Sequence, residues 1–339
     1  AMGGSGHARG ILGSVRRAGK LWLDENDHGT FLVGCPWDKK FETTPADDIA
    51  CLRRNTLQAV LRGGGQWWYD FGMVAGTPAF ASHGNVGWWD DPRLSQEIAA
   101  IHRVAQARHA YPFTRPADTL VVHDPWSFCH TVAQRWSLEG FKFGAQPPVG
   151  PNPFSARGMD GLLEGLYRSG LVFDEALIGE LATMDLSPFR LIIFGTTPIL
   201  TEAQRRLITT QLATGGRHLA LTGYAGWGDT APAEHVIGRW SDGSVSAARR
   251  ETAAATWWTF ALAPTEPTFL RALGRCAGCH VINDHDDATL LGDGLLMVHT
   301  LHGGARQLHL PDGPTIAVNL PPRSTTVFDA ATGAPLLAT

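Results

Sequence analysis

Three short segments that are almost wholly apolar constrain the fold of this chain more than any other feature. They are TLVVHD (119–124), RLIIFGTT (190–197) and HLALTGYAG (218–226). Apolar runs of this length without polar alternation are typical of strands that are buried on both faces of a sheet. Helical patterns over 159–169, 176–184 and 202–214 separate them, and Thr201 is placed to cap the last. The alternation predicts an α/β fold with a doubly wound, flavodoxin-like sheet.

The first hundred residues repeat the order strand, loop, helix. Short strands are predicted at 20–25 and 66–72, and helices are predicted to begin at Thr44-Pro45 and at Asp91-Pro92. Three glycines, 63–65, end the first helix. This is the rhythm of a (β/α) barrel, and two units are only about a quarter of the eight that closure requires. We therefore expect a partial barrel segment.

From about residue 285 the chain changes to short strand patterns separated by Gly, Pro and Asp turns, which predicts a small antiparallel β-sandwich. A boundary is also expected at 115–118, RPAD. The predicted domains are 1–115, late βα units of a TIM-type barrel; 116–284, the doubly wound domain; and 285–339, the small β domain.

Composition excludes several classes of partner. The 339 residues are 44% hydrophobic, carry a formal net charge of -4 and contain no run of Lys and Arg, so nucleic acid is not expected. No stretch approaches the ~20 apolar residues that span a bilayer. Residues 1–10 have no apolar core of a signal peptide, and five sparse cysteines are typical of a reducing compartment. We expect a cytoplasmic protein without membrane partners.

The densest group of chemically active side chains follows the first predicted strand. Asp24, Glu25 and Asp27 lie within four residues of one another, with His28 next. Such crowding is tolerated where a cation, a proton or a substrate hydroxyl balances the repulsion. Strand alternation places Glu25 on one face and Trp22 and Asp24 on the other. The alternative is a solvated acidic loop.

Twelve tryptophans are the compositional outlier. Flat aromatic faces beside acids suit stacking on a sugar ring, and this chain has two such groups: Trp67, Trp68, Tyr69 and Asp70, and then Trp88 and Trp89 with Asp90 and Asp91. The alternative is core packing, with Asp91 as a helix cap. Arg53 and Arg54, on the intervening helix, either pair with an acid of the first group or lie on a solvated face.

Other motifs are weaker. Residues 276–280, CAGCH, match the attachment pattern of c-type haem, and with His285 they could supply zinc ligands, but the segment also fits a turn from helix to strand. His28 with Asp24, Asp27 and Cys35 is a second candidate metal cluster. No G-x-S-x-G elbow occurs, and no Cys occupies a strand-to-helix elbow. We expect no cofactor and no bound metal.

The segments KLWLDENDHGT (20–30), LRRNTLQAVLRGGGQWWYDFG (52–72) and GWWDDPRL (87–94) together resemble the final barrel segments of bacterial retaining glycoside hydrolases related to the family 42 β-galactosidases. The remainder resembles that lineage too, with its glutamine-amidotransferase-like trimerisation domain and its small C-terminal β domain. The resemblance implies that Glu25 is the nucleophile or its neighbour, flanked by Asp24 and Asp27. It also implies that Trp67, Trp68 and Asp70 line a sugar subsite.

The chain departs from that family in lacking the earlier strands, including the one that bears the acid/base glutamate. The second carboxylate of the mechanism therefore has no family position here, and Asp70 is the nearest substitute. Three hypotheses follow: a β-galactosidase-like glycoside hydrolase or a truncated remnant of one; a non-catalytic oligomerising or carbohydrate-binding fragment; and a promiscuous metal-assisted ester hydrolase. The expected partners are a carbohydrate and further copies of the chain.

Overall fold

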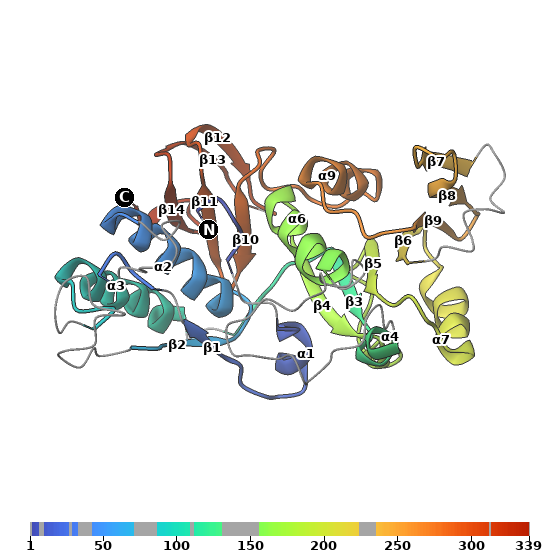
Figure 1. Cartoon of the computed structure of the whole chain (residues 1–339), viewed down its shortest axis with the longest axis horizontal. Helices are drawn as coiled ribbons and strands as arrows, with labels where there is room; N and C mark the ends of the chain where they lie inside the picture. The colour runs from blue at the N-terminus through green and yellow to red at the C-terminus, as the bar shows by residue number, and fades with distance from the viewer. Residues whose placement is uncertain are drawn as a thin grey trace. The chain divides into compact units, whose positions relative to one another are not determined.

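A computed structural model of the chain describes residues 2–6, 10–26, 29–32, 43–70, 87–108, 112–130, 156–223, 235–311 and 313–338. It is a mixed α/β structure with several sheets, in agreement with the predicted class (Figure 1). Its contacts divide it into two compact units. One comprises 1–116, 167–172 and 281–339, and the other comprises 117–166 and 173–280.

The first unit begins with two βα repeats. Helix α1 (Leu12–Arg17) precedes strand β1 (Leu23–Asn26), helix α2 (Pro45–Val60), strand β2 (Gly65–Trp68) and helix α3 (Pro92–Arg108). Strands β1 and β2 are paired in parallel, as the rhythm predicts. Thr44 opens α2 with a reciprocal capping box, because its hydroxyl accepts from the Asp47 N–H while the Asp47 carboxylate accepts from the Thr44 N–H.

The C-terminal part of the same unit is antiparallel throughout its described pairings. Strands β10 (Ala288–Gly292), β11 (Leu295–Thr300), β14 (Ser324–Asp329) and β15 (Pro335–Leu337) form one sheet in that order. Strands β12 (Gly304–His309) and β13 (Thr315–Leu320) form a separate pair. These strands coincide closely with the strand patterns expected beyond residue 285.

Helix α2 is buried because it lies between the β1–β2 pair and the C-terminal sheet (Figure 1). Arg53 and Arg54 are only 5% and 3% exposed, so the solvated-face alternative is wrong for both. Arg53 donates from Nε and Nη2 to the two carboxylate oxygens of Glu97 on α3, at 2.6 and 2.8 Å, and from Nη1 to the Thr325 carbonyl on β14. One guanidinium thus ties two helices to the sheet.

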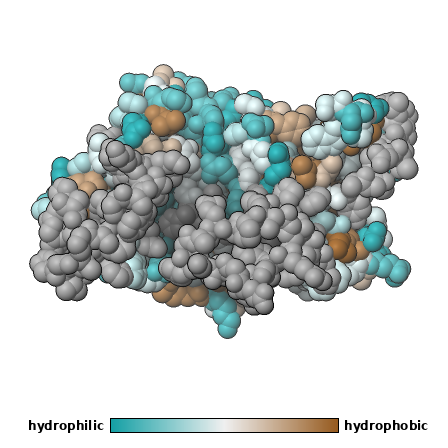
Figure 2. Space-filling model, in the orientation of Figure 1, coloured by the Kyte–Doolittle hydropathy of each residue, from teal (hydrophilic) through white to brown (hydrophobic). Residues whose placement is uncertain are grey.

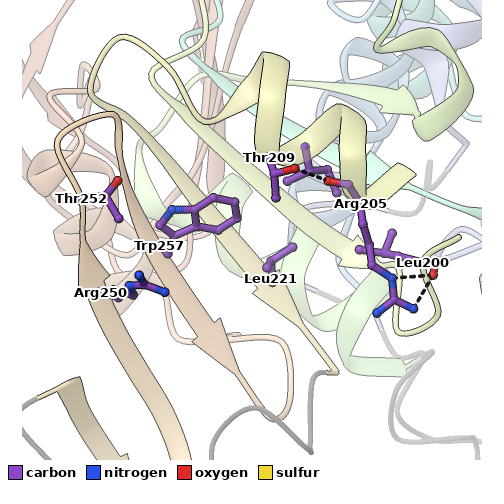
Figure 3. A pocket seen from close by; sticks show the side chains of 8 residues that line it. Leu200, Arg205, Thr209, Leu221, Arg250, Thr252 and Trp257 are labelled. Atoms are coloured by element: carbon purple, nitrogen blue, oxygen red, sulfur yellow. Dashed lines mark hydrogen bonds between the residues drawn. The ribbon is translucent and has the colours of Figure 1, made fainter. Parts of the chain in front are cut away.

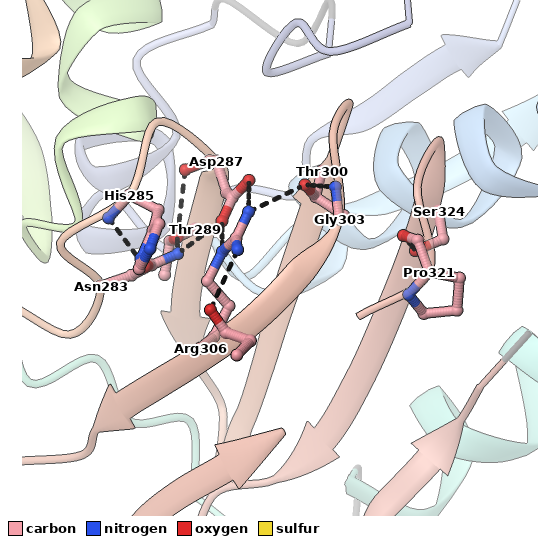
Figure 4. Close-up of polar contacts among 10 residues, drawn as sticks. Asn283, His285, Asp287, Thr289, Thr300, Gly303, Arg306, Pro321 and Ser324 are labelled. Atoms are coloured by element: carbon pink, nitrogen blue, oxygen red, sulfur yellow. Dashed lines mark hydrogen bonds and ion pairs between the residues drawn. The ribbon is translucent and has the colours of Figure 1, made fainter. Parts of the chain in front are cut away.

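A second buried ion pair organises the start of the C-terminal sheet (Figure 4). Arg306 donates to both carboxylate oxygens of Asp287, at 2.6 and 3.2 Å, and Asn283 donates to the same carboxylate at 3.1 Å. Burial opposes ionisation of Asp287, but the hydrogen bonds from Arg306, Thr300 and Asn283 hold its pKa below the ordinary value. Because the charges are paired bidentately, the buried carboxylate is tolerated.

The second unit is built on one seven-stranded sheet in the order β4-β3-β5-β6-β9-β8-β7. The first five strands are parallel, β8 is antiparallel to β9, and β7 is antiparallel to β8. The strands are β3 (Thr119–His123), β4 (Phe173–Leu177), β5 (Leu191–Thr196), β6 (Arg217–Thr222), β7 (Val236–Arg239), β8 (Val245–Glu251) and β9 (Ala255–Phe260). The helical segments are α4 (Pro125–His130), η3 (Ala156–Gly161), α6 (Leu162–Ser169), η4 (Ile178–Glu180), α7 (Glu202–Leu207), η5 (Ile208–Leu212) and α9 (Pro267–Cys276).

The predicted helix over 176–184 is wrong. Residues 173–177 form the edge strand β4, and one 3-10 turn, η4, follows it. The segment FDEAL contains good helix formers, but Phe173 to Ala176 are all buried beside β3, and its backbone groups are paired there in parallel. Tertiary pairing overrides local propensity in so short a segment. Strands β7, β8 and β9 were not predicted, and helix α9 was expected only as a helix without stated bounds ahead of the turn at 276–280.

Candidate functional site

The acidic segment forms the end of β1, and its side chains alternate as predicted. Asp24 and Asn26 are buried, at 7% and 0% exposure, whereas Leu23 and Glu25 are exposed. Asp24 and Glu25 therefore point to opposite faces of the strand. Asp27 and His28 lie outside the described residues.

The exposed face of this strand pair brings an acid and an indole together. Glu25 is the register partner of Trp67 in the parallel pairing of β1 with β2, and Trp67 is 43% exposed. Register partners on neighbouring strands point to the same face of a sheet. Leu23 on β1 is 55% exposed, and Leu21, just before the strand, is 72% exposed. Figure 2 shows a small apolar patch at the lower edge of the view, where the chain between α1 and β1 runs in Figure 1.

Three aromatic rings continue this face beyond the strand end. The rings of Trp67 and Tyr69 meet edge to face with centroids 6.2 Å apart, and the rings of Tyr69 and Trp88 meet in the same way at 5.8 Å. Contacts of this kind fix ring orientation. Trp67, Tyr69 and Trp88 therefore form an aromatic row that begins beside Glu25.

The backbone of Trp88 is held from both sides. Its N–H donates to Asp70 Oδ1 at 2.7 Å, and its carbonyl accepts from the Thr30 hydroxyl at 2.5 Å. A Cβ at Gly87 would lie 2.6 Å from Asp70 Oδ2, so a larger residue at position 87 would push this carboxylate away. Asp70 thus acts on the aromatic row by positioning Trp88. Thr30 and Gly87 were not singled out from the sequence, since neither carries a motif of its own.

Several of the predicted site residues lie elsewhere. Trp89 is 8% exposed and donates from Nε1 to the Tyr69 carbonyl at 2.8 Å, so it packs in the core. Arg54 donates to the Gly4 carbonyl and to Asn55 Oδ1, in the layer between α2 and the C-terminal sheet. Neither side chain joins the exposed face.

Trp22 and Trp68 also face away from Glu25. Trp22 donates from Nε1 to Asp24 Oδ1 at 3.4 Å, on the buried side of β1. Trp68 is the register partner of the fully buried Asn26. Asp91 is a helix cap, the alternative to a role in the sugar site. Its carboxylate accepts from the N–H and the guanidinium of Arg93 at the start of α3. Those bonds lower the pKa of Asp91 to about 2.

The CAGCH motif lies in the turn after α9, in agreement with the structural alternative. Cys279 is buried, and burial, with the nearby charge of Asp118, raises the pKa of its thiol to about 12. A thiol that stays protonated is a poor metal ligand. Within the described ranges, no group of three or more His, Cys, Asp or Glu side chains is arranged to hold a metal ion. The cluster of His28, Asp27 and Cys35 falls outside those ranges.

Solved β-galactosidases share the fold of this chain over about half of their own length. The enzyme from Rahnella sp. R3 matches with a TM-score of 0.57 and 14% identity over 91% of this chain and 54% of its own. The enzyme from Bacillus circulans sp. alkalophilus matches with a TM-score of 0.55 and 16% identity over 91% and 55%. A GH42 β-galactosidase from G. stearothermophilus matches with a TM-score of 0.53 and 13% identity over 88% and 52%.

The chain thus spans about half the length of these enzymes, and at this identity the likeness establishes the fold alone. It supports the resemblance to the family 42 lineage at that level. Neither a scan against protein-family models nor a search of curated proteins gave a match. No helix in the described part of the chain has both the length and the apolar character that crossing a bilayer requires.

Proposed function

We propose that the exposed face of β1 and β2 is a sugar-binding site and that the chain is a β-galactosidase-like glycoside hydrolase, or a truncated remnant of one. The observation that carries the proposal is the register pairing of Glu25 with Trp67 on that face. An exposed carboxylate next to an exposed indole supplies the two elements of a pyranose subsite, a charged group for the anomeric carbon and a flat apolar face for the ring.

The same proposal assigns the finer architecture. Residues 1–115 are late βα units of a TIM-type barrel, 116–284 an amidotransferase-like domain, and 285–339 a small C-terminal β domain. Helices cover the outer face of a (β/α) barrel, and α2 covers the Asp24 face, so Glu25 and Trp67 are on the face that would line the barrel interior. The five parallel strands follow one another along the chain as β3, β4, β5, β6 and β9. If they are numbered 1 to 5 in that sequence, their order in the sheet is 2-1-3-4-5, which is the flavodoxin-like order.

The chemistry would follow the retaining mechanism. Glu25 attacks the anomeric carbon, and a second carboxyl about 5–5.5 Å away protonates the departing oxygen. Asp24 points to the opposite face, and Asp70 already accepts a hydrogen bond from Trp88. Of the described acids of this segment, Glu25 is therefore the proposed nucleophile. Asp70 remains the proposed second carboxyl, and Asp27 a proposed flanking acid.

Hydrolysis of nitrophenyl β-D-galactoside by the purified chain tests the proposal. Glu25→Gln should lower kcat/KM by a factor of about 100 or more, since it removes the attacking charge while keeping the side-chain shape. Glu202→Gln, at an exposed position on α7, is the matched control and should leave the rate unchanged. Equal activity of the parent chain and Glu25→Gln would remove Glu25 from the mechanism.

The second candidate is a non-catalytic oligomerising or carbohydrate-binding fragment. It is favoured by the exposed Leu21 and Leu23, which border Glu25 on a strand pair whose outer edges have no strand partner among the described residues and so invite pairing with another chain. Light scattering at micromolar concentration should then give the mass of a homo-oligomer, and Leu23→Glu should shift it toward the monomer. A monomeric mass for the parent chain would reject this candidate.

A further inference from the structure

A second candidate site lies in the other unit, far along the sequence from Glu25. A cavity of about 420 Å³ opens on one face of the seven-stranded sheet, between α7–η5 and strands β6, β8 and β9 (Figure 3). Its volume is within the range of about 300–1,000 Å³ that small-molecule sites occupy.

The strand register explains why the wall of this cavity is both aromatic and cationic. Arg250 on β8 and Trp257 on β9 are antiparallel register partners, so their side chains share one face of the sheet. Leu219 on β6 is the parallel partner of Trp257, and alternation places Leu221 on the same face. Helical segment η5 closes the opposite wall with the buried Ile208.

The charge of the lining is one-sided. Its lining residues, among those that the structure describes, include the guanidinium groups of Arg205 and Arg250 and no carboxylate. Figure 3 shows these two groups on opposite sides of the cavity, with Trp257 and Leu221 between them. Arg205 is held by a backbone carbonyl and not by an acid, because its Nε and Nη2 donate to the Leu200 oxygen at 3.1 and 2.8 Å.

Two described acids close in sequence to the lining, Glu251 and Glu202, are engaged elsewhere. Glu251 pairs with Arg249, whose guanidinium lies over the Trp258 ring, and Glu202 pairs with Arg206 at 3.2 Å on the surface of α7. Within the described ranges Arg250 has no acidic partner. An apolar cavity bordered by an uncompensated guanidinium is complementary to a ligand that has an apolar body and a negative end.

We propose that this cavity binds a small planar aromatic anion of the aryl carboxylate class. The ring would lie against the Trp257 indole and the side chains of Leu221 and Ile208, and the carboxylate would accept hydrogen bonds from Arg250. The flat guanidinium matches a carboxylate bidentately, and the indole gives the ring a stacking surface. This site is independent of the proposed sugar site, because none of its residues belongs to β1 or β2.

The test is calorimetric titration of the full chain with naphthalene-2-carboxylate and, separately, with naphthalene-2-carboxamide, which has the same shape without the charge. The carboxylate should bind with one site per chain, and the carboxamide should bind at least about tenfold more weakly, the value of one charge-assisted hydrogen bond. Raising the salt concentration should weaken the carboxylate alone.

Variants locate the binding. Arg250→Gln should weaken carboxylate binding about tenfold and leave carboxamide binding unchanged, and the exposed position of Arg250 protects the fold. Arg206→Gln, on the outer surface of α7, is the matched control and should bind like the parent chain. Equal affinity for the two ligands, an unchanged affinity in Arg250→Gln, or no carboxylate binding at about 1 mM would each overturn the proposal.

Discussion

Glu25 and Trp67 are register partners on neighbouring parallel strands, and both side chains are exposed on the same face. Forty-one residues of chain, including all of α2, separate the two positions. The parallel pairing of β1 with β2 places the two residues side by side despite that separation. The capping box at the start of α2 and the glycine turn at its end fix where the pairing begins.

Two tryptophans of the same region should respond to substitution in opposite ways. Trp67→Ala should weaken galactoside binding by up to about tenfold with little change in stability, because the ring is 43% exposed. Trp89→Ala should cost about 3–5 kcal/mol of unfolding free energy, because that ring is 8% exposed and its indole donates to the Tyr69 carbonyl. Urea unfolding and ligand titration of both variants separate the two roles.

Asp70 can be tested as a positioning residue against its proposed role as a catalytic carboxyl. Asp70→Asn keeps an oxygen that can accept from the Trp88 N–H, whereas Asp70→Ala loses it. If the group only positions Trp88, Asn should retain most of the galactoside hydrolysis and Ala should raise KM. A loss of kcat by a factor of about 100 in Asp70→Asn, with unchanged KM, would make it the second carboxyl.

The buried pair of Arg53 and Glu97 should be costly to break from one side only. Glu97→Ala leaves a buried guanidinium without its carboxylate and should lower the unfolding free energy by about 3–5 kcal/mol. The double variant Arg53→Met, Glu97→Leu should recover much of that loss, because it removes both charges and keeps the volume. Denaturant unfolding of the single and double variants measures the difference. A single variant as stable as the parent would contradict the prediction.

His299 on β11 is held in one protonation state by its neighbours. Its Nε2 accepts from the Gly3 N–H at 3.0 Å, and its Nδ1 lies 2.7 Å from the Thr325 hydroxyl, which itself donates to the Ala50 carbonyl. Nδ1 therefore carries the proton, and Nε2 has no room for a second one. Burial and the nearby charge of Arg54 lower the pKa of His299 to about 3.

This shift makes the stability of the first unit depend on pH. The unfolded chain takes up the proton near pH 6.5 and the folded chain only near pH 3, so acid favours unfolding. The contribution of neutral His299 to the unfolding free energy is complete above pH 6.5. It is lost at about 1.4 kcal/mol per pH unit as the pH falls toward 3. His299→Gln should remove this slope from the plot of unfolding free energy against pH between pH 6.5 and 4. His309→Gln, at an exposed position, should leave the slope unchanged. Equal slopes in the two variants would count against it.

Much of the fold could be predicted because it depends on local signals. The capping residues and periodic apolar positions placed α2 and α3, and the uninterrupted apolar runs placed β3, β5 and β6. The last two residues of strand β4 fell within the predicted helix that begins at Ala176, because only pairing with β3 makes residues 173–177 a strand. Strands β8 and β9 were not predicted because their residues do not alternate between apolar and polar. That alternation is the signal of a strand with one solvent-exposed face, and neighbours such as Arg249 and Arg250 break it.

The sequence by itself determined which chemical groups are close along the chain: the acids at 24–27, the indoles at 67–68 and 88–89, and the strand alternation that separates Asp24 from Glu25. Only the tertiary structure decided that Trp67 and Trp88 belong to the aromatic row beside Glu25. It also decided that Trp89 and Arg54 lie away from that row. The physical reason is that alternation and helical periodicity fix the relative directions of side chains within one element. Which of those directions meets solvent is fixed by the elements that pack against it, and here those elements come from distant parts of the chain.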